Sequence, residues 1–504
     1  MNRRTHLMIL IWAITYAVLA AGLLYFRGGI GTVAISLGVA LGYLTWKNPA
    51  PATYVLLSLL PLTGFLNNIG GKAQAIPFFI GPFAGWAVGL TMRPAGSKEE
   101  PRLPTTMFYG LLALGGALIV SNIFGAHRYL QMVRSLGDTV AYPVARLQTY
   151  SYVEGWKNPL SAAHTLGWMS WGTLVISGGG LFFVLSWKYL KDILSFKKVM
   201  NTLFLSLIPT ILFGLFQSGG YQNLLNSGAF FQTDRINATF QDPNALAMSL
   251  SVLLPLLFGY SISVIKEKKG SILWILALLI HATALMALLF QTGTRSAILF
   301  MGICLISGAT LVTVKTGLPS LRNAFYGTIA IMTLLLGTYL LSSKTPVFQR
   351  MTTYYQEMQR EGLSVSGWMH IPSSRWQIWK RAVHHALRRP WTGSGPGTYL
   401  IEARLLAAEH MDLPTPNDHA GNYYLELWAE MGIGGLVAFL FILTATLKNS
   451  IGNYMRRSDS SRLYLISSFM GMAIALFFGS HMIQFELSIL FWMMVLLLWK
   501  EDPL

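Results

Sequence analysis

An arginine and a helix-start signal stand together at the edge of a hydrophobic run in the stretch RINATFQDPNALA. Arg235 lies a few residues before Asp242, which can cap a helix, as can Gln241, and Pro243 suits the first helical position. The free N–H groups and positive dipole of a helix N-terminus bind phosphate well, and an arginine adds a permanently charged fork. The stretch therefore predicts an anion site; the alternative is an arginine that only reaches the membrane interface.

A second arginine, Arg295, begins another apolar run in the stretch QTGTRSAILF. The connection before this run is very short, so Arg295 must lie close to the membrane surface. Interface anchoring is again the alternative. Two arginines at matched depth, each next to a helix N-terminus, favour one shared anion site over two separate anchors.

The stretch SSRWQIWKRAVHHALRRPWTGSGPGTY predicts a basic amphipathic helix followed by a glycine-rich turn. The apolar positions on one face are Trp376, Trp379, Val383 and Leu387, and the cations largely on the other are Arg375, Arg381, His385 and Arg388. Such a helix normally lies on lipid, and the alternative is a lid whose basic face meets an anionic headgroup. The turn lacks the Gly-Lys-Ser/Thr of a nucleotide-binding loop.

A histidine begins a further helix in the stretch PNDHAGNYYLELWAEMGIGG. Asp418 or Asn417 is expected to cap this helix, which runs on into a membrane segment, and His419 lies at its start. A positive helix end keeps a histidine neutral and able to accept a proton. The alternative is a structural or solvated histidine, which is the commoner role of a lone histidine in a loop.

Membrane helices must hold these residues, because the chain is long and apolar. Of its 504 residues, 53% are hydrophobic and 11% are charged, under half of the charged fraction usual in a soluble domain. The expected fold is an all-α, polytopic, GT-C-like membrane protein with about 14 transmembrane helices of roughly 20 residues and one long, partly helical periplasmic loop. The apolar runs begin near Leu7, Ile30, Ala52, Ile76, Met107, Thr165, Met200, Asn244, Ser271, Ser296, Ala324, Ile433, Leu463 and Glu486.

The net charge of +17 comes from lysines and arginines that gather in alternate loops. Every even-numbered loop is basic when the N-terminus is placed in the cytoplasm. This pattern predicts that both termini are cytoplasmic and that the arginine motifs face the periplasm, and it explains the charge without a nucleic-acid partner. The first eleven expected helices fall in residues 1–342, the periplasmic loop in 343–432 and the last three helices in 433–504. The loop contains five of the ten histidines: His370, His384, His385, His410 and His419.

Several common catalytic patterns are absent from the sequence. It has no HExxH, no Gly-x-Ser-x-Gly elbow, no His and Cys cluster with zinc spacing and no Asp-x-Asp pair. The single cysteine, Cys304, lies within an apolar run and is expected to be a small core residue. A reaction here is therefore expected to rely on arginines rather than on a divalent metal or another cofactor.

Together, four motifs resemble those of the O-antigen ligase and polymerase superfamily of bacterial membrane glycosyltransferases. RINATFQDPNALA is similar to the family's arginine, Gly-Thr-Phe and Pro-Asn-x-x-Ala at the head of a membrane helix, and TGTRSA to its Thr/Ser-x-Ser/Thr-Arg-Gly/Ser element. SRWQIWKRAVHHALRRPWTGSGPGTY resembles its Arg-x-x-x-Trp and Pro-x-x-Gly-x-Gly-Pro-Gly stretch, and HAGNYYLELWAEMGIGG its His-Asn-x-x-Leu-x-x-x-x-Glu-x-Gly-x-x-Gly motif. The four occur in the family's order between Arg235 and Gly435.

The resemblance implies a glycosyltransferase of lipopolysaccharide or other surface polysaccharide assembly in the bacterial inner membrane. Its donor would be a glycan linked to undecaprenyl diphosphate in the periplasmic leaflet, and its acceptor another glycan, lipid A–core or a protein. Arg235 and Arg295 would bind the diphosphate and act in catalysis, and a loop histidine would activate the acceptor hydroxyl. Further substrate-binding residues would be Arg375, Arg381, Asn244 and Asn422.

One position departs from the family pattern. Gly421 stands directly before Asn422, where the family usually has histidine, and His419 lies two residues earlier, where some members carry a second histidine. His419 is therefore the expected base, with Asp418 close by. The alternative is a protein that has lost this acid–base step.

Polymerase and ligase activities are hard to separate from the sequence. The number of expected crossings and the length of the outer loop lean slightly towards a polymerase, with a ligase or a protein O-oligosaccharyltransferase as alternatives. A lipid-linked glycan transporter would place ionisable groups near the bilayer midplane, whereas these charged motifs stand at outer helix ends. An inactive scaffold would fit Gly421. For an enzyme, Arg235→Ala or Arg295→Lys is expected to abolish transfer without unfolding the protein.

Overall fold

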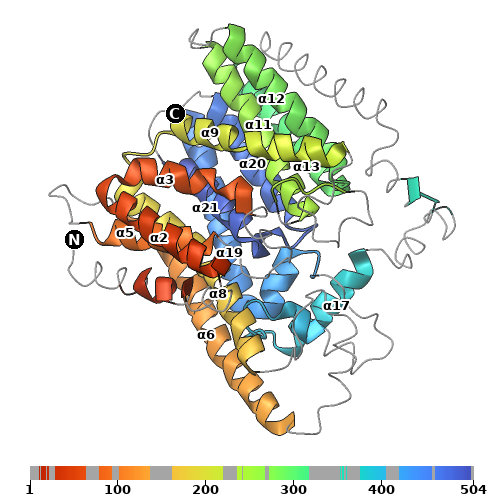
Figure 1. The fold of residues 1–504 in the computed structure, drawn as a ribbon. Coiled ribbons are helices and arrows are strands. Elements are labelled where there is room, and N and C mark those ends of the chain that lie inside the picture. Colours follow the sequence, from red (N-terminus) through yellow and green to blue (C-terminus); the bar gives the residue numbers. More distant parts are fainter. Residues whose placement is uncertain are drawn as a thin grey trace.

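The structure is a computed structural model that describes most of the chain. The described residues are 11, 13–18, 20–21, 29–63, 79–93, 102–136, 162–219, 235–240, 242–266, 272–316, 352–353, 355–356, 359, 375–403, 419–456 and 460–500. Every regular element in this part of the chain is a helix, which confirms the expected all-α class (Figure 1).

The helices follow one another in an order that matches the apolar runs of the sequence. Their bounds are α2 Gly29–Lys47, α3 Pro49–Ser58, η1 Leu60–Leu62, α5 Ile80–Thr91, α6 Thr105–Leu136, α8 Ala162–Leu190, α9 Phe196–Ser206, α10 Ile208–Ser218, α11 Pro243–Lys266, α12 Ile272–Gln291, α13 Arg295–Thr316, α17 Arg375–Arg388, α19 Tyr423–Arg456, α20 Ser460–Ala475, η5 His481–Ile483 and α21 Phe485–Trp499.

Five helical segments in the described residues are long and apolar enough to cross a membrane. They are Thr105–Tyr129, Trp168–Leu190, Phe196–Ser218, Pro243–Ser261 and Tyr423–Asn453. Shorter apolar helices accompany them, among them α5, α13, α20 and α21. The segments support a multi-pass membrane protein. The total of about 14 crossings stays a prediction, because the run from Ala324 and part of the run from Leu7 lie outside the described residues.

Gly432 divides α19 into a first piece, residues 423–431, and a second piece, residues 433–456. The helix begins at Tyr423 and runs on into the crossing expected from Ile433, and Gly432 interrupts it with φ 69° and ψ −178°. Glycine adopts a positive φ without a steric penalty. The carbonyl oxygen of Pro390 accepts the Ile433 N–H at 2.7 Å, so the helix restarts at Ile433 with this donor satisfied.

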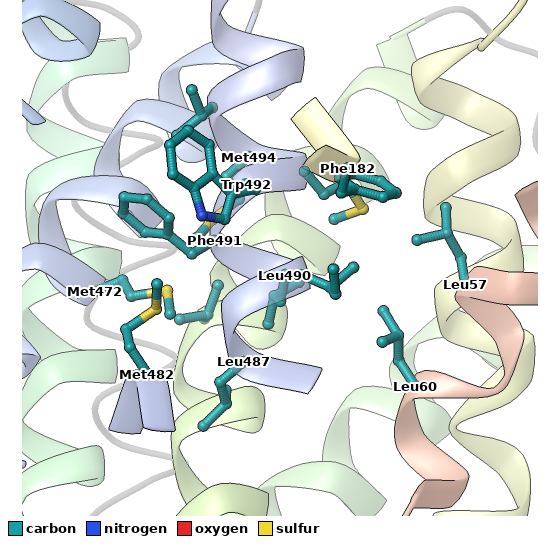
Figure 2. Close-up of a cluster of buried hydrophobic side chains, with 14 of the residues drawn as sticks. Leu57, Leu60, Phe182, Met472, Met482, Leu487, Leu490, Phe491, Trp492 and Met494 are labelled. Atoms are coloured by element: carbon teal, nitrogen blue, oxygen red, sulfur yellow. The ribbon is translucent and has the colours of Figure 1, made fainter. Parts of the chain in front are cut away.

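α21 forms the centre of the bundle. Every side chain from Phe485 to Trp499 is buried, as a helix that is apolar on all sides requires. α21 packs against α8, α19, α20 and α11. Figure 2 shows part of this core, with the labelled residues Leu57, Leu60, Phe182, Met472, Met482, Leu487, Leu490, Phe491, Trp492 and Met494. The connection that enters α21 is therefore held at the middle of one end of the bundle.

The two ends of the bundle carry different parts of the sequence. At one end, Lys500 Nζ donates to the Leu194 carbonyl oxygen (2.6 Å) and Arg462 Nη2 donates to the Lys500 carbonyl oxygen (2.7 Å). At the other end, the Tyr423 N–H donates to the Leu476 carbonyl oxygen (2.8 Å). Lys500 and Arg462 thus lie at the end of the bundle opposite the start of α19. Which end faces the periplasm stays a prediction.

Candidate active site

Arg235 joins the N-termini of two helices. Its Nε donates to the carbonyl oxygen of Thr292 (2.6 Å), and its Nη2 donates to Asn244 Oδ1 (2.8 Å) and to Thr294 Oγ1 (3.0 Å). Asn244 lies in the first turn of α11, and Thr294 directly precedes α13. The arginine is only 8% exposed. Its positive charge is therefore held at a fixed place between the two helix starts, which we call the arginine junction.

The helix-start signal before α11 is formed as predicted. Asp242 Oδ1 accepts the N–H of Asn244 (2.9 Å), and the Asp242 carbonyl oxygen accepts the N–H of Leu246 (3.1 Å). Asp242 is therefore the cap, with Pro243 as the first helical residue. Gln241, the other expected cap, lies outside the described residues.

Arg295 is the first residue of α13 and is exposed, in contrast to Arg235. The two arginines meet at one junction, because Thr294, which bonds Arg235, is the neighbour of Arg295 in the chain. Gly293 has φ 70°, which allows the tight turn between α12 and α13. Two positive charges and two helix N-termini at one place favour a dianionic ligand such as a diphosphate. The binding roles of Arg235, Arg295 and Asn244 stay predictions.

A carboxylate from the following helix orients His419. The Nδ1 atom of His419 lies 2.6 Å from Glu426 Oε1, and the histidine side chain is 28% exposed. Glu426 Oε2 also accepts the N–H of Ala420 (3.2 Å), which fixes the carboxylate. With Glu426 ionised, Nδ1 donates the hydrogen bond and Nε2 is left as an acceptor. A general base with an orienting carboxylate has this arrangement.

Asn422 caps α19. Its Oδ1 accepts the N–H of Leu425 (3.2 Å), and its carbonyl oxygen accepts the N–H of Glu426 (3.0 Å). The expected caps Asp418 and Asn417 lie outside the described residues. The Asn422 side chain is buried and engaged in the fold. The predicted contact with substrate would therefore have to come from its amide nitrogen.

Gly421 holds α17 against the start of α19. Its carbonyl oxygen accepts hydrogen bonds from Arg375 Nη1 (3.1 Å) and Trp379 Nε1 (3.4 Å). Its φ is +60°, a conformation that strains other residues. The glycine at the position of the family's histidine therefore has a structural role. It also brings Arg375 to the segment that carries His419.

α17 buries polar side chains against the protein and leaves apolar ones exposed. His385 is 2% exposed and Arg381 is 6% exposed, whereas Trp376 is 39% and Leu387 is 59% exposed. Arg381 and His385 therefore lie on the buried side of α17, opposite exposed apolar side chains, and the choice between a helix on lipid and a lid stays a prediction. Arg381 packs towards the protein, and its Nε has no hydrogen-bond partner among the described residues. Its predicted contact with substrate is untested.

A buried carboxylate explains the burial of this polar face. Glu402 forms ion pairs with Arg128 and, at 3.2 Å, with Arg389, and its charge also faces His385. The His385 ring stacks on Tyr399 with ring centroids 5.2 Å apart. Burial dominates and lowers the pKa of His385 to about 4. At neutral pH His385 is therefore an uncharged, packed ring.

The glycine-rich turn after α17 docks on the first piece of α19. The N–H groups of Ser394 and Gly395 donate to the carbonyl oxygens of Ala429 (3.0 Å) and Glu430 (2.9 Å). Glu430 Oε1 in turn accepts the N–H of Tyr399 (2.9 Å). These backbone donors are used within the fold, so the turn fixes α17 relative to α19 and does not present them to a ligand.

The connection between α20 and α21, residues 476–484, lies between the arginine junction and His419; we call it the outer connection. Gln484 Nε2 donates to Asp242 Oδ2 at 3.4 Å, which ties one side to the start of α11. On the other side, Phe478 packs against Trp379 of α17 with ring centroids 6.1 Å apart. The outer connection thus joins the two groups of candidate residues.

Two parts of this site are absent from the sequence predictions. Glu426 has a recognisable signal, because an acidic residue in the first turn of a helix often reaches back to a preceding N–H group. The outer connection carries no motif, and only its contacts reveal its position. Among the described residues no three His, Cys, Asp or Glu side chains gather as metal ligands would. The metal-free reaction stays a prediction.

The fold and these residues define a helical, multi-pass membrane protein with two arginines and an oriented histidine at one end. Residues 281–440 match the family model of the O-antigen ligases. The match supports the predicted resemblance to the superfamily of O-antigen ligases and polymerases over this part of the chain. The matched segment contains Arg295, Arg375, Arg381, His419 and Asn422, whereas Arg235 and Asn244 lie upstream of it. No curated protein matches the chain.

Proposed function

We propose that this protein transfers or polymerises a glycan carried on undecaprenyl diphosphate at the periplasmic face of the bacterial inner membrane. The observation that carries the proposal is the arginine junction, where Arg235 bonds the starts of α11 and α13 beside Arg295. The oriented pair of His419 and Glu426 lies across the outer connection from it. The match to the O-antigen ligases supports the same assignment.

The proposed reaction is a displacement at the anomeric carbon of the donor sugar. The bond from this carbon to the diphosphate oxygen breaks, and undecaprenyl diphosphate leaves with the electron pair. The acceptor oxygen forms the new bond, and its proton passes to His419 Nε2. Arg295 and Arg235 stabilise the charge that develops on the leaving group, and Glu426 stabilises the protonated histidine.

The two arginines contribute in different ways. Arg295 is exposed, which supports the proposal that it contacts the diphosphate directly. Arg235 is buried and already donates to Thr292, Asn244 and Thr294, so it also holds the two helix starts together. Loss of Arg235 is therefore expected to reduce stability as well as transfer. Arg295→Lys is the better test of diphosphate binding, because it changes an exposed side chain.

One experiment tests the function and separates its branches. Purified protein receives its native undecaprenyl-diphosphate-linked glycan with and without lipid A–core, and product size is read on a gel. We expect a ladder without core, as a polymerase makes; a single shifted band that needs core would identify a ligase. Arg295→Lys should abolish either product. Donor binding without product in both lanes would exclude polymerase and ligase and leave a protein acceptor or a scaffold.

A further inference from the structure

Four buried polar atoms that have no hydrogen-bond partner among the described residues follow one another along the outer connection and into α21. They are Ser480 Oγ, His481 Nε2, Gln484 Oε1 and Glu486 Oε1. Buried polar atoms in folded proteins nearly always have a partner, either protein or ordered water. Leaving such a group without one costs about 1–3 kcal/mol. A run of four within so short a segment indicates that another molecule supplies the missing hydrogen bonds.

These atoms extend from the arginine junction towards His419. Gln484 uses its Nε2 to bond Asp242, the cap of α11, which places its side chain beside the junction. His481 lies on the side of Arg375, close enough to feel its charge. Burial, and after it this charge, lower the pKa of His481 to about 3. Arg375 itself bonds Gly421, two residues after His419. Any group bound across the outer connection therefore lies between the proposed diphosphate site and the proposed base.

The chemistry of the four atoms selects the kind of ligand. The Ser480 hydroxyl can donate or accept, neutral His481 can do either, and the oxygens of Gln484 and Glu486 accept. An anion would face two acceptor oxygens, and a cation would face the positive charge of Arg375. A neutral group that both donates and accepts many hydrogen bonds fits this set, and the hydroxyls of a sugar have this property.

We propose that the outer connection binds the sugar that carries the reacting anomeric carbon of the donor. This inference rests on the proposed function and deepens it, since it assigns the part of the donor next to the diphosphate. The sugar lies across Ser480 and Gln484, with its diphosphate at Arg295 and its anomeric carbon towards the acceptor hydroxyl held by His419. Because residues 476–484 follow the segment that matches the O-antigen ligases, the outer connection is a place where sugar specificity can vary independently of that segment.

The test compares two lipids and needs no turnover. Purified protein in lipid nanodiscs is titrated with undecaprenyl diphosphate and with the native undecaprenyl-diphosphate-linked glycan of the source strain. We expect the wild-type protein to bind the glycan-bearing lipid more tightly. Gln484→Leu should weaken binding of the glycan-bearing lipid about tenfold and Ser480→Ala about threefold, with binding of undecaprenyl diphosphate unchanged. Ser480→Ala leaves the bond to Asp242 intact and is the milder variant.

Two controls make the outcomes distinct. Thr444→Val changes an exposed threonine that bonds only to its own helix, and it should bind both lipids as the wild type does. Arg295→Gln should weaken the binding of both lipids equally. Unchanged binding of the glycan-bearing lipid to both outer-connection variants overturns the inference, as does an equal loss for both lipids. If the wild-type protein binds neither lipid, the proposed function fails and the inference fails with it.

Discussion

Two histidines of the segment between α13 and α19 show how surroundings decide what a side chain can do. His419 is partly exposed, and Glu426 bonds one ring nitrogen, which leaves the other nitrogen for the acceptor hydroxyl of the proposed reaction. His385 is buried on Tyr399, and neither ring nitrogen has a hydrogen-bond partner among the described residues. Both histidines have a carboxylate nearby, so a carboxylate alone does not distinguish the proposed base from the buried ring. Access to solvent and a direct hydrogen bond make the difference.

The two arginines of the junction repeat this contrast. Arg295 is exposed at the first position of α13, whereas Arg235 is buried and engaged with three protein groups. In the proposed reaction Arg295 contacts the diphosphate, and Arg235 shapes the site. In both pairs the sequence presents similar residues in similar motifs, and only their packing separates the roles.

Replacing the exposed histidine should have the largest effect. We expect His419→Gln to lower the transfer rate by at least about a hundredfold, which is the lower range for loss of a general base. His385→Phe, which keeps the packed ring, should retain most of the rate. The comparison requires transfer assays on both variants at equal donor saturation. Full activity of His419→Gln would remove His419 from the reaction.

The buried histidine should instead affect stability at acid pH. The pKa of His385 is lowered from 6.5 to about 4, so between these values the unfolded chain binds a proton that the folded chain does not. Stability therefore falls as the pH drops from 6.5 to 4, by up to about 3 kcal/mol, and this contribution is fully present above pH 6.5. The charged groups that face His385 are Glu402, Arg389, Arg128 and Arg388.

Unfolding of the purified protein across this pH range measures the effect. His385→Phe should flatten the profile relative to the wild type. His481 is common to both proteins, so its own lowered pKa cancels from the difference. Identical profiles for the two proteins would show that His385 is not buried in the neutral form.

The local part of the site follows from the sequence, and the packed part does not. The cap at Asp242 and the start of α13 at Arg295 depend on neighbouring residues, and the structure forms both. The facing of α17 depends on Glu402 and on Arg128 of α6, which no pattern within α17 reveals. The outer connection is equally hidden, because its unpartnered atoms are recognised only once the surrounding helices are in place.

Removing the charge of Glu426, beside His419, should have a different effect from removing the charge of Glu402, beside His385. Glu426→Gln removes the charge that orients His419 and stabilises its protonated form, and we expect transfer to fall roughly ten- to a hundredfold. The pH–rate profile should shift as well, because the histidine loses its acidic partner. Glu402→Gln should reduce stability and leave the shape of that profile unchanged. An unchanged profile in Glu426→Gln would contradict the orienting role.

A smaller effect is expected where this chain departs from the family pattern. Gly421→Ala places a side chain at φ +60° and brings its Cβ to 3.2 Å from Arg375 Nη1. The backbone strain should cost about 1 kcal/mol of unfolding free energy. Gly421→Asn should cost less, since asparagine tolerates this conformation. Denaturant unfolding of the two variants checks the order, and equal stabilities would show that the backbone at 421 relaxes.

The smallest effect should come from restoring the family's histidine. At the present backbone conformation a Cβ on residue 421 points towards Arg375 and Ile378 of α17. A histidine there would face α17 rather than the nitrogen position that His419 provides beside Glu426. Gly421→His is therefore expected to leave the rate of the His419→Gln variant unchanged. Recovery of transfer in the double variant would mean that the start of α19 can turn so that a histidine at either 419 or 421 reaches the acceptor. The role of His419 would then depend on the backbone conformation at Gly421 rather than on the bond to Glu426.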